Sequence, residues 1–173
     1  MFRGATSSTE NRRSASSAVD KRQYIDRLSD TFRYIMQNGQ TGATTLGEEL
    51  DFMDAYIYLL ETRYEGKIFF TIDITPGYGM WTLPAFSIQP LIENAVKHNT
   101  ITKSLPLTIT VATEEGNLII SNEIHPKLDV PDGTGIGLKN LSKRSKLLTG
   151  KHTPITNHCR TSSVILPLTP PQP

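Results

Sequence analysis

The chain has 173 residues, with 18 lysines and arginines against 17 aspartates and glutamates, four histidines and one cysteine. Its length fits one ordinary domain with a small appendage, and its near-neutral charge excludes a nucleic-acid binder held mainly by phosphate attraction. A lone Cys159 excludes a disulfide framework or a multi-cysteine zinc site and favours a reducing compartment. The longest apolar run, Ala55 to Leu60, is far shorter than the ~20 residues of a membrane helix, so we expect no direct membrane contact.

Residues 1–18 are rich in serine, threonine and arginine and carry little apolar surface. Such a segment cannot offset the entropy lost on ordering, which predicts a disordered leader. After it, apolar residues recur at steps of three and four: Ile25, Leu28, Phe32 and Ile35. This spacing predicts a short amphipathic helix that ends at Asn38-Gly39.

Thr45 and Glu48 have the spacing of a capping box, which predicts that a second helix begins here. Its apolar stripe consists of Leu46, Leu50, Met53, Ile57, Leu60 and Tyr64. Burying this stripe requires a partner surface. The first helix is expected to supply part of it, and whether a second protomer supplies the rest stays open. We therefore expect residues 19–66 to form a helical dimerisation or linker region.

Strands and helices alternate in the remainder of the chain. The expected strands span residues 68–74, 107–112, 118–121 and 163–168, and the expected helices span residues 83–98 and 138–148. Residues 114–117 form a hairpin turn, and Pro90 either kinks its helix or lies in the first turn. Paired strands mixed with helices predict an α+β domain over residues 67–168, with a mixed sheet covered by helices on one face and a tail at 169–173.

The helix expected before residue 99 combines an apolar face with four polar residues: Glu93, Asn94, Lys97 and His98. An amide oxygen on Asn94 suits a hard magnesium ion, the two cations suit phosphate oxygens, and Glu93 suits proton transfer or orientation. Two simpler alternatives stay open. Glu93 and Lys97 also have the spacing of an exposed ion pair, and His98 that of a cation at a helix C-terminus.

A second segment, Gly133-Thr-Gly-Ile-Gly-Leu-Lys-Asn140, places glycine at every second position ahead of a helix. Glycines allow backbone amides to approach an anion closely, and the positive end of the following helix favours negative charge. An ordinary turn uses the same residues, so this segment alone is weak support for a phosphate site.

Together and in this order, the two segments resemble the nucleotide-binding domain of the GHKL superfamily, and within it LytS-type sensor histidine kinases. Leu83-Pro84 through His98 resembles the N box, and residues 133–140 resemble the glycine box. Residues 48–64 resemble the helix that precedes the catalytic domain. The resemblance implies a two-layer α/β sandwich of the Bergerat type that binds ATP and Mg²⁺ between the N-box helix and a lid at residues 123–132.

The resemblance also implies residue roles. Asn94 holds magnesium, and Glu93 activates or aligns the nucleophile. Nucleotide contacts fall on Asn94, Lys97, His98, Asn122, Gly133, Gly135, Gly137, Leu138, Lys139 and Asn140. The implied reaction transfers the γ-phosphate of ATP to a histidine, and the implied partner is a response regulator, for instance of the LytTR type. A homodimer in the cytoplasmic portion of a membrane sensor is implied, with no nucleic-acid partner.

Two departures from the family pattern bear on this function. Residues 1–97 contain no histidine, so the acceptor expected in an Asn-Pro-His-Phe-like segment must come from elsewhere. Asn122 stands where the superfamily usually holds the adenine amino group with an aspartate. It accepts a hydrogen bond without the charge-assisted component, and Asp129 and Asp132 are candidate substitutes.

Two other functions compete with the kinase. A degenerate member of the superfamily acts as a non-catalytic dimerisation or regulatory module, which the missing acceptor and Asn122 favour. An ATP-hydrolysing conformational clamp has an additional domain that contributes a catalytic lysine, and this chain lacks room for it.

Overall fold

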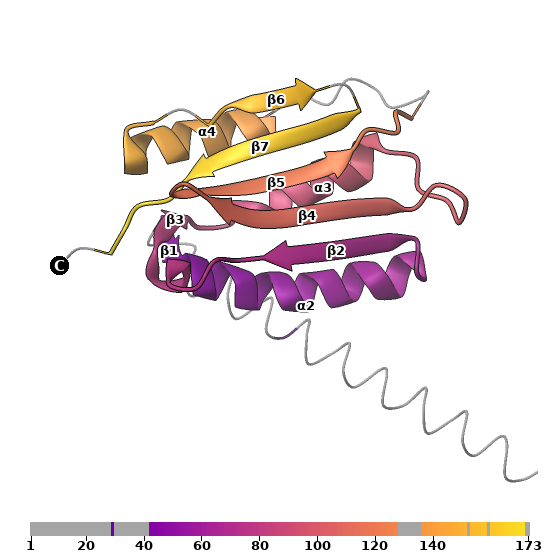
Figure 1. Cartoon of the computed structure of the whole chain (residues 1–173), viewed down its shortest axis with the longest axis horizontal. Helices are drawn as coiled ribbons and strands as arrows, with labels where there is room; N and C mark the ends of the chain where they lie inside the picture. Colours follow the sequence, from indigo (N-terminus) through magenta and orange to yellow (C-terminus); the bar gives the residue numbers. More distant parts are fainter. Residues whose placement is uncertain (1–28, 30–41, 128–135, 152, 159, 172–173) are drawn as a thin grey trace, which may run out of the picture.

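A computed structural model describes residue 29 and residues 42–127, 136–151, 153–158 and 160–171 (Figure 1). The leader at 1–18 and the first helix expected after it lie outside this range, apart from residue 29. So do the lid residues 128–132, together with Gly133, Gly135, His152 and Cys159.

The described chain alternates strands and helices (Figure 1). The helices are α2 (Leu46–Tyr64), the 3-10 helix η1 (Tyr78–Met80), α3 (Ile88–His98) and α4 (Ile136–Thr149). The strands are β1 (Ala43–Thr45), β2 (Ile68–Asp73), β3 (Thr82–Pro84), β4 (Leu107–Glu114), β5 (Asn117–Glu123), β6 (Ile155–His158) and β7 (Thr161–Pro167).

The predicted capping box at the start of α2 is confirmed. The backbone N–H of Glu48 donates to the Thr45 hydroxyl at 3.3 Å, and the Glu48 carboxylate accepts from the Thr45 backbone at 3.0 Å. Two backbone donors that the helix itself leaves unpaired are thereby satisfied. The helix ends at Glu65, whose φ of 48° is left-handed and cannot continue it.

The helix predicted to begin at residue 83 begins instead at Ile88, because residues 82–84 form β3 and pair antiparallel with β1. Neither β1 nor β3 was among the expected strands. Leu83 is fully buried in this strand. Pro90 lies in the first turn of α3, where a missing N–H removes no helical hydrogen bond.

The main sheet has the strand order β2-β4-β5-β7-β6. Strand β2 pairs parallel with β4, and the other neighbours pair antiparallel, so the expected mixed sheet is confirmed. The hairpin predicted at residues 114–117 joins β4 and β5. Strand β6 was not predicted, because its four residues at the sheet edge carry no extended apolar alternation.

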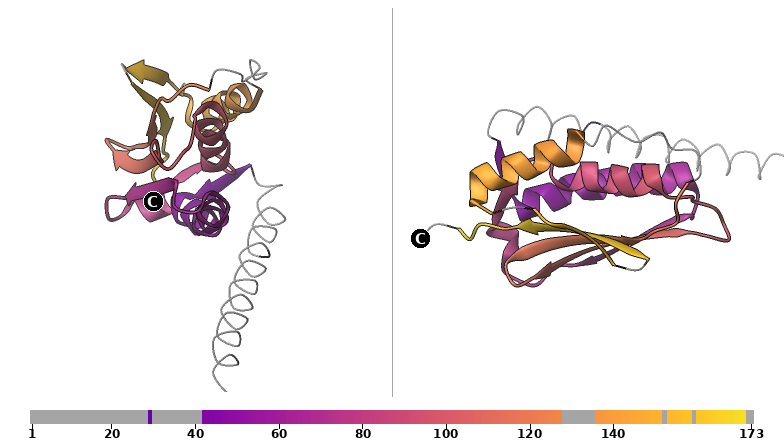
Figure 2. Two further views of the ribbon diagram at one scale, coloured as in Figure 1. Left: turned by 90° about the vertical axis from the view of Figure 1, so that its right-hand side faces the viewer. Right: turned by 90° about the horizontal axis from the view of Figure 1, so that it is seen from above.

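Helices α2, α3 and α4 lie on one face of this sheet (Figure 2). The strands turn alternate residues toward the helices, so Ile109 and Leu118 are fully buried there. On α3, Ile88 and Ile92 are also fully buried and complete one contiguous apolar core. The α+β class is therefore confirmed. In the part of the chain that the structure describes, no helix has the length and apolarity needed to cross a membrane.

Two leucines on α4 test this core directly. Leu141 is 0% exposed and Leu147 is 87% exposed, so the same truncation probes burial on one helix. We expect Leu141→Ala to lower the free energy of unfolding by about 2–5 kcal/mol and Leu147→Ala by less than about 0.5 kcal/mol. Urea unfolding measures both, and equal losses for the two variants would contradict this packing of α4.

Candidate functional site

Helix α3 separates its apolar residues from most of its predicted functional residues. Its apolar side chains pack in the core, whereas Glu93, Lys97 and His98 are exposed and Asn94 is half-buried. The helical period places Asn94 and His98 on one flank of the exposed face and Glu93 on the other. The predicted polar group therefore lies on a surface that a solute reaches.

The Glu93 carboxylate is held by two donors. Gln89 Nε2 donates to Glu93 Oε1 at 2.8 Å, and the Tyr56 hydroxyl of α2 reaches the same oxygen at 3.4 Å. Within the described residues no ion pair joins Glu93 to Lys97, so the simpler alternative of an i, i+4 pair is not realised there. Burial raises the pKa of Tyr56, and the negative charge of Glu93 raises it further.

Asn94 differs from Glu93 in having no partner that holds it. Its side chain makes no hydrogen bond to any residue in the described part of the chain. Its amide oxygen is therefore available to a ligand, and Lys97 and His98 place two further polar side chains within one turn. The described residues contain no cluster of three or more histidine, cysteine, aspartate or glutamate side chains able to hold a metal without further ligands.

The start of α3 is fixed by a carboxylate from another helix. Glu49 of α2 is fully buried and accepts backbone N–H bonds from Phe86 at 3.1 Å, Ser87 at 2.8 Å and Ile88 at 3.0 Å. The side chain of the N-cap residue, Ser87, donates to the Pro84 carbonyl instead of capping its own helix. Glu49 therefore replaces the usual local cap.

Helix α4 follows the glycine-rich segment and carries four of its predicted site residues. Gly137, Lys139 and Asn140 are exposed, whereas Leu138 packs against the core. Helix α3 lies between α2 and α4 in the helical layer (Figure 2). Gly133 and Gly135 lie outside the described residues, so the structure does not place the loop itself beside α3.

Asn122 lies near the end of β5, where alternation puts it on the helix-covered face with Leu118 and Ile120. Its side-chain nitrogen donates to the Glu123 carbonyl at 2.6 Å, which leaves the amide oxygen as the group available to a ligand. No hydrogen bond connects Asn122 to α3 in the described residues.

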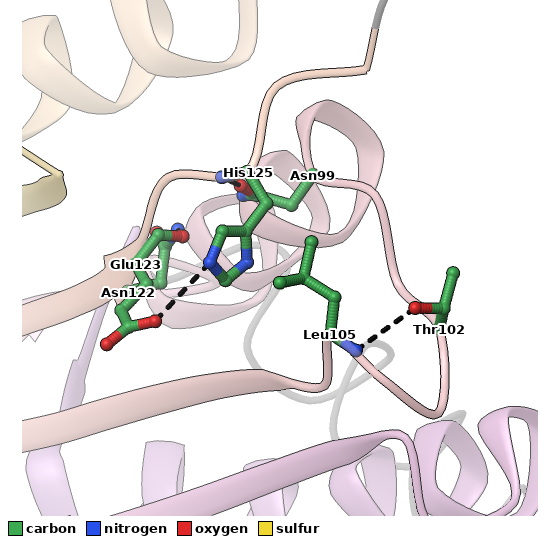
Figure 3. A network of polar contacts seen from close by, with 6 residues as sticks. All are labelled: Asn99, Thr102, Leu105, Asn122, Glu123 and His125. Carbon is green, nitrogen blue, oxygen red and sulfur yellow. Dashed lines mark hydrogen bonds and ion pairs between the residues drawn. The ribbon is translucent and has the colours of Figure 1, made fainter.

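The segment after β5 is joined to the end of α3 through Asn99 (Figure 3). The buried Asn99 side chain donates to the Ala95 carbonyl at 2.8 Å and accepts the His125 backbone N–H at 2.5 Å. The His125 ring pairs with Glu123 at 3.4 Å, as the dashed line in Figure 3 marks. The first residues of the expected lid are thereby anchored to α3.

Lys127 strengthens this junction. Its ammonium group donates to the carbonyls of Val96 at 3.2 Å and Lys97 at 3.1 Å, and its backbone N–H donates to the His98 carbonyl at 3.2 Å. A cation at a helix C-terminus satisfies carbonyls that the helix leaves unpaired and complements its dipole. His98 had been assigned this role in one alternative, and here Lys127 performs it.

Sequence patterns did not single out Glu49, Tyr56 or Asn99 as parts of this site. A usable signal existed for Glu49, because it lies three residues after Leu46 and four before Met53, in register with the apolar stripe of α2. A charged residue in such a register is buried and needs partners. No comparable local pattern marks Asn99, whose partner His125 is 26 residues away.

The raised pKa of Tyr56 yields a pH-dependent stability. The folded chain binds the phenolic proton more tightly than the unfolded chain, so this contribution is complete below the ordinary pKa of 10.0 and is lost as pH rises above it. We expect wild type to lose more stability than Tyr56→Phe between about pH 9 and pH 11 in urea unfolding.

Tyr64→Phe on the same helix is the control, because no hydrogen bond joins Tyr64 to Glu93 in the residues described here. Equal alkaline losses for wild type and Tyr56→Phe would show that the half-buried Tyr56 hydroxyl and the Glu93 carboxylate are not close in solution.

Comparison with known proteins shows similarity to histidine kinases. A family model described as Histidine kinase matches residues 8–68. Proteins named Sensor histidine kinase/phosphatase LytS from Staphylococcus aureus strains MRSA252 and N315 are each 29% identical over 147 residues. These alignments cover 75% of this chain and 25% of each relative, so the matched region is a quarter of the relatives' length.

Among solved structures, the cytoplasmic segment of histidine kinase QseC matches with a TM-score of 0.51 at 15% identity. The match covers 73% of this chain and 77% of that one, and the likeness concerns the fold. The sequence matches and the shared fold agree with the resemblance carried by the two predicted boxes. Over the matched parts, the chain is similar to histidine kinases of two-component signalling, and among them to LytS sensor kinases.

Proposed function

We propose that residues 67–168 form a GHKL-type ATP-binding catalytic domain of a LytS-type sensor histidine kinase, with residues 19–66 as its dimerisation and linker region, whose helix α2 packs into the core of the domain. The observation that carries this proposal is the construction of α3. Its core face and both of its ends are fixed by packing and hydrogen bonds, while Glu93, Asn94, Lys97 and His98 remain open to solute. A rigid helix with an open polar face is suited to hold a phosphorylated ligand.

The described residues fit magnesium-bound ATP. Mg²⁺ is commonly held by one or two protein oxygens while phosphates and waters complete its shell, so a single unpaired amide oxygen at Asn94 suffices without a larger cluster. Lys97 and His98 would meet the negative charge of the phosphates. Bound MgATP would supply the transferable phosphoryl group and a divalent charge that offsets its developing negative charge.

Glu93 has the role of orienting or accepting the proton of the attacking group. Its carboxylate is fixed by Gln89 and Tyr56, which limits the directions in which its free lone pairs point. Phosphoryl transfer depends chiefly on positioning and charge stabilisation, so a restrained carboxylate contributes more than a freely rotating one.

The remaining nucleotide contacts follow the family pattern. Asn122 would accept the adenine amino group through its side-chain oxygen, since its nitrogen is already used by the Glu123 carbonyl. Gly133, Gly135 and Gly137 would let the backbone approach the phosphates, with Leu138, Lys139 and Asn140 opening α4 behind them.

The physiological setting follows from the same proposal. The phosphoryl acceptor is a histidine other than the four of this chain, supplied by another chain or by a part of the protein outside this sequence, and a response regulator receives the phosphate in turn. We propose a homodimer through the helical region, in the cytoplasmic portion of a membrane sensor. The LytS relatives support this setting by similarity over the matched quarter of their length.

Asn94→Ala tests the nucleotide site. We expect MgATP binding, followed with a fluorescent ATP analogue, to weaken at least about tenfold, because the amide ligand to the metal is lost. Asn117→Ala is the matched control, since within the described residues the Asn117 side chain donates only to the carbonyls of Glu114 and Glu115 in the β4–β5 turn. Wild-type binding by Asn94→Ala, or binding that is indifferent to magnesium, would contradict the proposal.

A non-catalytic regulatory module is the second candidate. The absence of histidine before residue 98 and the local use of the Asn122 amide favour it over the active kinase. Incubation of the full chain with labelled ATP and a separate acceptor-helix fragment distinguishes the two. The kinase proposal predicts labelled histidine on the fragment, and no transfer while nucleotide is bound would establish the regulator instead.

A further inference from the structure

We infer that Glu49 is a positioning residue that couples helix α2 to the nucleotide site on α3, so that the placement of α2 sets nucleotide affinity. This inference rests on the proposed ATP-binding function and adds a route for its regulation. The observation behind it is that a buried carboxylate on α2 holds the first backbone amides of α3.

The contact between Glu49 and the start of α3 is suited to make a movement of α2 shift α3. Both Glu49 oxygens are engaged: Oε1 accepts from Ser87 and Ile88, and Oε2 accepts from Phe86. Bonds from backbone amides fix the main chain itself, in contrast to bonds between flexible side chains. The carboxylate also lies at the positive end of the α3 dipole, and it is 0% exposed, so water does not replace it without a rearrangement.

The segment 85–88, which connects the start of α3 to α2 and is called the joint below, has an uncommon backbone conformation. Phe86 has φ of 57°, in the left-handed region that residues with a side chain rarely adopt. Its N–H is bound by Glu49, and its ring packs edge-on against Phe52 of α2 with centroids 6.1 Å apart. Both restraints on this residue therefore come from α2, which makes the conformation of the joint dependent on that helix.

Helix α4 holds the same joint from the other side. Arg144 Nη1 donates to the Ala85 carbonyl at 2.6 Å, one residue before Phe86. The joint is thus attached to the helix that follows the glycine-rich segment and to α2. From Ile88 to Asn94 is six residues of α3, or about 9 Å of helix, so a shift at the joint moves the proposed metal ligand with it.

If Glu49 were only a structural cap, its replacement would lower the fraction of chain that is folded. The affinity of the folded chain for its ligand would stay unchanged. Coupling has a different signature, because it is reciprocal: if α2 affects nucleotide affinity through Glu49, nucleotide must affect α2 through Glu49. The test therefore measures three quantities on the full chain: hydrogen exchange at the amides of residues 86–88, the affinity for MgADP, and the effect of MgADP on hydrogen exchange in α2.

The main variant is Glu49→Gln, which keeps the shape but replaces one acceptor oxygen with a donor that faces a backbone N–H. Glu48→Gln is the matched control, because Glu48 is the neighbouring carboxylate and caps α2 itself rather than α3. Hydrogen exchange by NMR follows the amides of Phe86, Ser87 and Ile88, and calorimetry measures MgADP affinity under conditions where each variant is fully folded.

We expect Glu49→Gln to accelerate exchange at these three amides about tenfold or more and to raise the Kd of MgADP at least about fivefold. Glu48→Gln is expected to leave both within about twofold of wild type. A folded Glu49→Gln with wild-type affinity overturns the coupling and leaves the proposed function intact. A wild-type chain that binds no nucleotide overturns the proposed function, and the coupling with it.

A measurement on wild type alone covers the case in which Glu49→Gln does not fold. Saturating MgADP is expected to slow exchange at the Phe86–Ile88 amides and in the α2 turn around Glu49. Protection confined to the exposed half of α3, with no change at the joint or in α2, overturns the inference while confirming that nucleotide binds.

Discussion

The carboxylate of Glu49 at the start of α3 is the interaction on which the geometry of the site depends. A buried charge is costly unless it is fully hydrogen-bonded, and here three backbone donors and a helix dipole compensate it. The same bonds satisfy amides that the first turn of α3 leaves without partners. Because these amides belong to the first residue of the site helix and the two residues before it, and the carboxylate belongs to α2, the position of one helix is defined by the other.

Helix α3 meets two demands that conflict in most helices. Its core face must pack without voids against the sheet, and its other face must keep polar groups open for a ligand. Fixing both ends reconciles them: Glu49 holds the N-terminus, and Asn99 and Lys127 hold the C-terminus. Asn94, midway along α3, therefore does not have to hold the helix in place, and its side chain has no hydrogen-bond partner in the described chain.

Local sequence patterns predicted the parts of this structure that depend on neighbouring residues. The capping box of α2, the apolar face of α3 and the β4–β5 hairpin each follow from spacings within a few residues. Contacts between distant segments escaped prediction: the pairing of β1 with β3 delays the start of α3, and Glu49 reaches amides 37 to 39 residues away. The chemistry of the Glu93 and Asn94 side chains indicated their roles, and the family resemblance added the identity of the ligand, which we propose to be MgATP.

The most direct test of the account is calorimetric titration of the full chain with ATP, first with magnesium and then with a chelator in excess. The account predicts saturable heat with magnesium, and little or none when magnesium is removed or when Asn94 is replaced by alanine. Absence of heat with millimolar MgATP, from protein shown to be folded by its unfolding transition, would contradict the central claim that α3 holds the nucleotide through its metal ion.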